Sequence, residues 1–235
     1  AAGDDLVFPT GVTQLVTTNN FSPNRAFNSV TFLGANFVLR GNPLVLTNGI
    51  RCGNGTAANA IDAAITLGAL QSFVVTNASA SLLLRGTNLT LGAFGLTLSG
   101  SGRMDISNQI TGTSGIIKNG ANTVLFFGSA ANTYLGATLV NQGTLLLSKT
   151  NVTAVAGELI VGDGTGGTDA DVVRILRANQ IANGSAVTVN SSGLLDCSPL
   201  PNGENETIGS LQLNDGGHVV GPNGSTLTVA GNLSY

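Results

Sequence analysis

The 235-residue sequence contains no tryptophan, a single histidine and only 21 charged side chains. Lysine and glutamate, which usually cover the surfaces of helices, are nearly absent, so a helical protein is not expected. The net charge is only −3 and the basic residues form no cluster, which argues against a nucleic-acid partner. No run of 18 apolar residues occurs, and no membrane-spanning helix is predicted.

Glycine and short apolar runs take the place of the missing residue types. The chain has 33 glycines and is 42% hydrophobic. Runs of about five residues alternate apolar and polar side chains and then stop at glycine or asparagine, as in 27–34, 81–86 and 95–100. Glycine and asparagine accept a left-handed backbone and therefore mark turns. The connections are too short for helical crossovers, so an all-β chain of short strands is predicted.

The clearest structural unit runs from Gly115 to Leu147. Three apolar runs, at 116–117, 124–127 and 144–147, are separated by turns that contain glycine or asparagine. This unit has the pattern strand, turn, strand, turn, with no room for a helix. Similar spacing over the whole chain predicts a solenoid in which each coil adds three short strands.

The same unit resembles a known repeat. The segments Lys118–Thr123, Asn132–Gly136 and Asn141–Leu145 resemble the autotransporter-associated beta strand repeat, whose pattern is approximately K-x-G-x-G-x-L-x-L-x-G-x-N-x-Y-x-G-x-T-x-V-x-x-G-T-L. The sequence departs from that pattern at Asn122, where glycine is usual, and at Phe126 and Phe127, where leucine and a small polar residue are usual. The resemblance implies a right-handed parallel β-helix in a large secreted or cell-surface protein of bacteria, and it implies no activity.

Residues 1–235 are therefore predicted to form one right-handed parallel β-helix of roughly eleven coils, at about 21 residues per coil. A spacing of about 4.8 Å per coil gives a length of roughly 50 Å. The alternative all-β fold is an antiparallel sandwich, which normally needs about 100 residues and clearer hairpin turns.

One alanine-rich segment, 57–67, could form a helix by propensity. However, Ile61, Ala63, Ile65 and Leu67 fall on one side of a two-residue alternation. This pattern favours a strand from Ile61 to Leu67, with a helical turn before it. A second helical turn is expected near Ala178–Ala182.

No catalytic or cofactor-binding residue is predicted, and the chain is not expected to be an enzyme. Its twelve carboxylates are scattered, and it contains no HExxH, GxSxG or P-loop motif. The pairs Asp4–Asp5 and Glu204-x-Glu206 are expected to be solvated at the surface. His218 is expected to be a strand or turn residue rather than a general base, because no nucleophile motif or second base accompanies it.

The best ligand candidate is a glycine-rich stretch, 162–173. The stretch resembles the calcium-binding nonapeptide of parallel β-rolls, with Asp163, Asp169 and Asp171 as candidate ligands, and it departs from the nonapeptide at Asp169, where glycine is usual. Carboxylates spaced by two residues on a turn can converge on a cation that takes six to eight oxygen ligands. The nonapeptide works in tandem and here occurs once, so a polar loop between coils is the alternative interpretation.

The two cysteines allow a geometric test of the solenoid. Cys52 and Cys197 are 145 residues apart in sequence, which corresponds to about seven coils, or roughly 30 Å. A disulfide requires Cα atoms within about 7 Å. Unpaired, buried or partly buried thiols are therefore predicted.

The predicted function is that of a non-enzymatic structural or adhesive protein, a β-helical segment of a surface fibre or secreted passenger. The start Ala1–Asp5 resembles the product of signal-peptide cleavage, which predicts a secreted or cell-surface location. The strand pattern continues to Tyr235 without a cap, so the end coils are expected to continue a longer chain or to stack head to tail on another copy, giving a filament.

The alternative is a carbohydrate-binding or carbohydrate-cleaving β-helix, with surface glycans as partners. With Tyr134 and Tyr235 as the only tyrosines and no tryptophan, platforms for stacking sugars are few.

Overall fold

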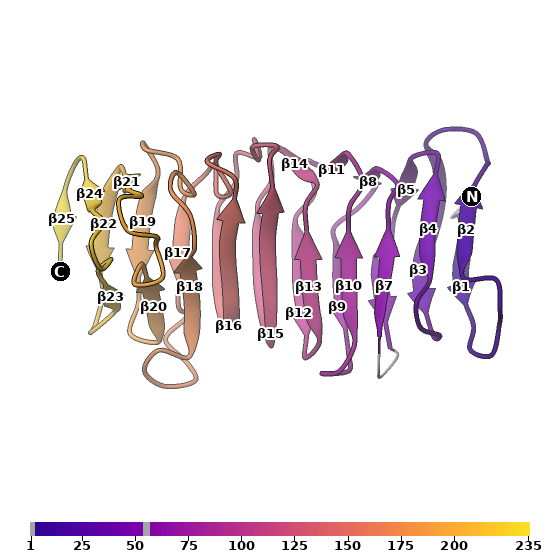
Figure 1. Cartoon of the computed structure of the whole chain (residues 1–235), viewed down its shortest axis with the longest axis horizontal. Coiled ribbons are helices and arrows are strands. Elements are labelled where there is room, and N and C mark those ends of the chain that lie inside the picture. Colours follow the sequence, from indigo (N-terminus) through magenta and orange to yellow (C-terminus); the bar gives the residue numbers. More distant parts are fainter. Residues whose placement is uncertain (1–2, 54–56) are drawn as a thin grey trace.

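The computed structural model describes residues 3–53 and 57–235, so Ala1 and Ala2 of the expected cleavage product lie outside the described residues. Within these ranges the chain forms strands, turns and bends and contains no helix. Every strand pairing among the described residues is parallel. The chain is a parallel β-solenoid (Figure 1), and this pairing excludes the antiparallel sandwich.

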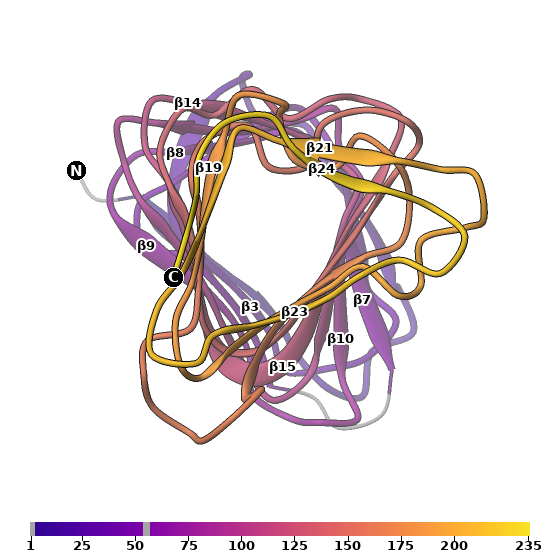
Figure 2. The same cartoon turned by 90° about the vertical axis from the view of Figure 1, so that its left-hand side faces the viewer.

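Three faces enclose the interior (Figure 2). The first face is built from β1 (Asp4–Phe8), the second half of β3 (Arg25–Phe32), β6 (Ile50–Cys52), β9 (Gln71–Val75), β12 (Leu96–Gly100), the first halves of β15 (Ile116–Gly128) and β16 (Thr138–Lys149), β17 (Leu159–Val161), β19 (Ala186–Val189), β22 (Ser210–Leu213) and β25 (Leu233–Ser234).

The second face is built from β2 (Val16–Asn19), β4 (Val38–Gly41), β7 (Ala58–Ile61), β10 (Ser81–Leu84), β13 (Arg103–Ile106), the second halves of β15 and β16, β18 (Asp171–Ile175), β20 (Gly193–Asp196) and β23 (His218–Val220). The third face is built from the first half of β3, β5 (Leu44–Leu46), β8 (Ile65–Leu67), β11 (Asn88–Gly92), β14 (Gln109–Gly112), β21 (Glu206–Ile208) and β24 (Leu227–Val229).

One inward column of the first face shows how many turns the solenoid has. It contains one residue from each turn, namely Leu6, Val30, Ile50, Phe73, Leu98, Lys118, Val140, Val161, Val189 and Leu213. The ends of this column are 207 residues apart over nine steps, or 23 residues per turn. The solenoid therefore has about ten turns, with β25 beginning a further one. Its length is about 48 Å at 4.8 Å per turn, and the number of turns is close to the roughly eleven that were predicted.

The two-residue alternation of the sequence decides which side chains enter the core. Within β15 and β16, Val124, Phe126, Leu145 and Leu147 point inward and are at most 1% exposed. Parallel, in-register pairing places each of them directly on its equivalent in the next turn; Phe126, for example, pairs with Leu147. Stacking like side chains in this way removes apolar surface from water along the whole axis.

Two expectations about local structure are wrong. The segment Ile61–Leu67 is not one strand, because the chain turns a corner after β7 ends at Ile61 and β8 begins only at Ile65. The described residues just before this segment, 57–60, lead into β7 instead of forming the expected helical turn, and Ala178–Ala182 contains no helical turn either. In the second segment Ile181 makes an isolated parallel bridge to Val155, so solenoid pairing overrides the helix propensity of alanine there.

The cysteine prediction is confirmed. Cys52 lies in β6, in the third turn, and Cys197 follows β20, in the ninth. Both are buried free thiols. Burial raises the pKa of the Cys197 thiol to about 12, which makes this thiol poorly reactive near neutral pH. In the part of the chain that the structure describes, no helix is long and apolar enough to cross a membrane.

Replacing Gly100 by alanine is expected to destabilise the solenoid more than replacing Gly92. Both glycines have a left-handed backbone, with φ of +110° and +62°, which costs alanine roughly 1–2 kcal/mol. A Cβ on Gly100 would lie 2.0 Å from the carbonyl oxygen of Val75 in the turn below, whereas one on Gly92 meets nothing within 4 Å. Denaturant titration should show about 1–3 kcal/mol of additional loss for Gly100→Ala; equal losses would contradict the close packing of these turns.

Candidate functional site

A hollow of about 450 Å³ lies at the corner between the first and second faces. Three consecutive turns contribute to it: the middle of β15, the middle of β16, and the loop between β17 and β18. Its polar lining consists of Asn119, Asn141, Gln142, Asp163, Thr165 and Asp171. The other lining residues are glycines and alanines, so no large apolar side chain lines the hollow.

The loop between β17 and β18 forms the outer wall of this hollow. The first-face step from Leu159 to Val187 is 28 residues long, against 21 for the step from Thr138 to Leu159. The additional residues extend beyond the neighbouring turns before β18 (Figure 1). Gly162, Gly164, Gly166, Gly167 and Asp169 all have a left-handed backbone, which glycine adopts without steric cost.

Two of the three predicted calcium ligands reach the hollow and the third does not. Asp163 and Asp171 line it, whereas the carboxylate of Asp169 lies 3.2 Å from Nδ1 of His218. Among the described residues, no group of three or more histidine, cysteine, aspartate or glutamate side chains is placed to hold a metal ion. Two carboxylates of the predicted loop thus share the hollow, and the three do not converge.

Hydrogen bonds orient the two carboxylates of the hollow. Oδ1 of Asp163 accepts hydrogen bonds from the backbone N–H of Thr165 at 2.9 Å and from its hydroxyl at 2.6 Å, and these bonds lower the pKa of Asp163. Oδ2 of Asp171 accepts one from the hydroxyl of Ser192 at 2.5 Å. Asp171 is only 1% exposed, and this burial raises its pKa. The pKa values of the two groups are thus shifted in opposite directions.

Beside these carboxylates, Lys118 occupies an inward position of the first face between Leu98 and Val140. Its Nζ donates hydrogen bonds to the carbonyl oxygens of Gly120 and, at 2.7 Å, of Gln142. Burial lowers the pKa of Lys118 to about 8, and the charge of Asp171 partly opposes that change. A buried ammonium group therefore offsets part of the negative charge of the hollow.

A second polar feature, the buried polar spine of Asn132, Gln180 and Glu206, spans the part of the third face between β14 and β21, where no named strand is formed. The side chain of Asn132 accepts from the N–H of Ile110 at 2.9 Å and donates to the carbonyl of Ala154 at 2.7 Å. All three spine side chains are at most 2% exposed. They join backbone groups of neighbouring turns where no strand is formed, which satisfies buried N–H and C=O groups.

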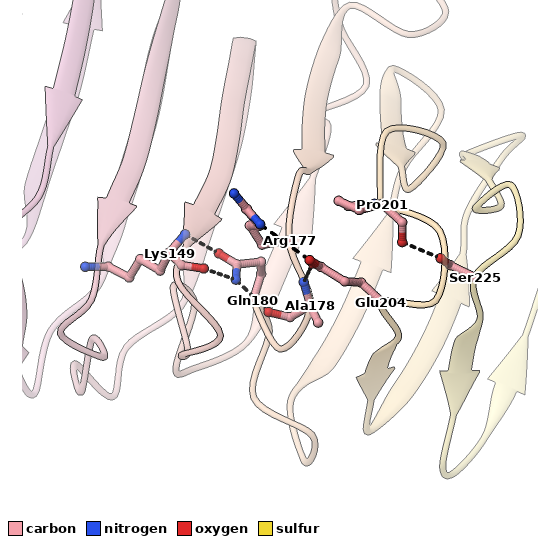
Figure 3. A network of polar contacts seen from close by, with 7 residues as sticks. All are labelled: Lys149, Arg177, Ala178, Gln180, Pro201, Glu204 and Ser225. Carbon is pink, nitrogen blue, oxygen red and sulfur yellow. Dashed lines mark hydrogen bonds and ion pairs between the residues drawn. The ribbon is translucent and has the colours of Figure 1, made fainter.

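Gln180 makes the densest contacts of the spine (Figure 3). Its Oε1 accepts from the N–H of Lys149 at 2.7 Å, and its Nε2 donates to the carbonyls of Lys149 and Ala178, each at 2.8 Å. At the outer edge, Glu204 accepts from the N–H of Ala178 at 2.8 Å and lies 3.5 Å from Arg177. Farther along the same loops, the hydroxyl of Ser225 donates to the carbonyl of Pro201 at 2.7 Å.

The prediction that Glu206 lies at the surface is wrong, because its side chain is fully buried. Its two carboxylate oxygens accept the N–H groups of Gln180 at 2.8 Å and Ile181 at 2.9 Å. Gln180 and Ile181 lie outside the named strands, and a side-chain acceptor takes the place of a backbone carbonyl for their N–H groups. Burial raises the pKa of Glu206 to about 7, and the two N–H donors oppose that rise. Asp4 and Asp5, by contrast, are exposed as expected.

The remaining singled-out residues are not part of either polar feature. His218 is exposed in β23, as expected for a strand residue. Tyr134 is buried in the core, with its hydroxyl 2.5 Å from that of Thr138, and Tyr235 is fully exposed at the end of the chain. Neither tyrosine lines the corner hollow.

Comparison of the chain with protein-family models, with curated proteins and with solved structures found no match. The resemblance of residues 118–145 to the autotransporter-associated repeat therefore stays a prediction.

A second buried lysine lies at the start of the spine. Nζ of Lys149 donates to the carbonyls of Ala130 at 2.8 Å and of Phe127 and Asn108 at 3.2 Å each. Burial lowers its pKa to about 8. Lysine can satisfy three carbonyls at once because its ammonium group carries three N–H donors.

Raising the pH from 8 to 9 is expected to increase the free energy of unfolding by about 1 kcal/mol for each buried lysine. Their pKa values are about 8 in the folded chain and 10.5 in the unfolded reference. In this range the unfolded chain binds more protons, so stability rises with pH. Denaturant titrations at fixed pH should show the rise, reduced by about half in Lys149→Met. A stability that falls from pH 8 to 9 would contradict the burial of both ammonium groups.

Proposed function

We propose that this chain is a non-enzymatic structural segment of an extracellular or cell-surface protein, a stiff β-solenoid that holds adhesive surfaces at a distance. The observation that supports this most is the inward column with one residue in each of ten turns. Each turn is hydrogen-bonded to the next, so length is added without a hinge between the turns.

The surface is consistent with a spacer. Only 21 of the 235 residues are charged, and the turns carry short uncharged polar residues in their place. In this role the edge strands of the end turns, such as β1 and β25, would pair with further turns of a longer protein or with a second copy. Such a contact joins two different surfaces and extends along the axis.

A carbohydrate-cleaving function is the second candidate, and the pair Asp163 and Asp171 is the observation that favours it. Glycoside hydrolysis uses one protonated and one ionised carboxyl group. Here burial raises the pKa of Asp171, while hydrogen bonds from Thr165 lower that of Asp163. Opposite shifts within one hollow are typical of acid and base pairs.

A polysaccharide-degradation screen distinguishes the two candidates. The structural proposal predicts no release of reducing sugar from any polysaccharide by the native chain. Turnover by the native chain that is lost in both Asp163→Asn and Asp171→Asn, with Asp215→Asn as an active control, would overturn the structural proposal in favour of hydrolysis.

A further inference from the structure

We propose that the corner hollow is a binding site for a neutral saccharide, held by hydrogen bonds rather than by stacking. This inference goes beyond the structural role, because the solenoid would serve as a spacer with or without a ligand at this corner. It depends on the lining, on the fixed loop that walls the hollow, and on the lysine beside it.

The volume of about 450 Å³ lies in the usual range of small-molecule sites, roughly 300–1,000 Å³. Its polar groups are the amides of Asn119, Asn141 and Gln142, the hydroxyl of Thr165, the exposed carboxylate of Asp163 and the buried carboxylate of Asp171. Each amide can both donate and accept hydrogen bonds. A ligand that matches such a lining needs many groups that also do both, and the hydroxyl groups of a sugar have that property.

The wall of the site is ordered in advance of binding. Thr165 donates twice to Asp163, and the hydroxyl of Ser192, which donates to Asp171, also accepts the N–H of Gly164 at 3.0 Å. These bonds tie the loop to the next turn of the solenoid. Binding groups fixed in this way lose little conformational freedom when a ligand binds.

The charges favour a neutral ligand over a divalent cation. Two carboxylates line the hollow, but the ammonium of Lys118 interacts electrostatically with Asp171. The third carboxylate of the loop, Asp169, faces His218 instead. Calcium takes six to eight oxygen ligands and gains most from several ionised carboxylates around it.

The test is saturation-transfer NMR of the full chain with cellobiose, maltotriose, lactose and N,N′-diacetylchitobiose. We expect binding of at least one of them, weakened about tenfold in Asn141→Ala and in Asp163→Asn, since a charge-assisted hydrogen bond is lost in the latter. Asp163→Asn keeps the acceptor for the N–H of Thr165, so the loop retains its fold. Asp215→Asn, an exposed aspartate outside the hollow, is the matched control and should bind as the native chain does.

Absence of transfer to all four saccharides, or binding that is unchanged in both variants, would overturn the proposal. A calorimetric titration with calcium chloride completes the test. Calcium binding that is lost in Asp163→Asn would overturn the saccharide assignment in favour of a cation site. Binding without turnover leaves the structural proposal intact, so failure of either proposal can be recognised separately.

Discussion

Replacing Gln180 by leucine is expected to lower the free energy of unfolding by about 3–5 kcal/mol. The side chain serves three backbone groups, the N–H and carbonyl of Lys149 and the carbonyl of Ala178. Leucine has a similar volume but cannot make these bonds, so three buried groups lose their partner at about 1–3 kcal/mol each. Burial of the leucine side chain recovers part of this loss.

Gln212→Leu is the matched control for this variant. Gln212 is exposed in β22, and its Nε2 donates only to the side chain of Asn214. A surface substitution of this kind usually changes stability by less than about 0.5 kcal/mol. Guanidinium titrations followed by circular dichroism measure both variants. Equal stability of the two variants would show that the buried polar spine does not hold the later turns together.

Phe126→Ala is expected to have a comparable effect, a loss of about 3–5 kcal/mol. The Phe126 ring is fully buried in β15, between Ile106 in the turn before and Leu147 in the turn after. Truncation loses the burial of the ring and leaves a cavity that the two flanking backbones, tied by parallel hydrogen bonds, can close only in part.

The adjacent residue offers an internal control with the same chemistry. Phe127 points outward from the same strand and is only half-buried. Phe127→Ala should therefore cost no more than about 1 kcal/mol. If both alanine variants lost equal stability in thermal or denaturant unfolding, the inward and outward assignment of β15 would be wrong.

The all-β architecture could be predicted because it depends on local patterns. Alternation of apolar and polar residues decides which side of a strand is buried, and glycine or asparagine at regular intervals decides where the chain turns. The corner between Ile61 and Ile65 escaped this reasoning. Ile61, Ala63 and Ile65 are all buried, so the alternation continues through the corner as it would through a strand.

The buried polar groups could not be predicted for a different reason. Glu206 lies in a polar loop sequence, and its burial depends on the unpaired N–H groups of Gln180 and Ile181, which are contributed by the preceding turn. Lys118 likewise occupies an inward position because carbonyls of two turns surround its ammonium group. The partners of Glu206 are 26 and 25 residues away in sequence, and the Gln142 carbonyl that binds Lys118 is 24 residues away. Local periodicity carries no information about contacts at such a distance.

The candidate site was only partly predictable. Carboxylates spaced by two residues indicated a polar loop, and Asp163 and Asp171 do share a hollow. Asp169 has a left-handed backbone, with φ of 57°, and its carboxylate faces His218, which is 49 residues distant. The amide side chains of Asn119, Asn141 and Gln142 stand at ordinary turn positions in the sequence. Only the stacking of the turns brings them to the same corner of the solenoid.

About ten turns form one hydrogen-bonded stack, which side chains continue where the third face has no strand. Amide hydrogen exchange of the native chain tests it most directly. The amides of Ile110, Gln180 and Ile181, which donate to side-chain oxygens, should exchange as slowly as strand amides such as that of Val173. Exchange of these three amides as fast as that of the exposed loop 163–168 would contradict the account.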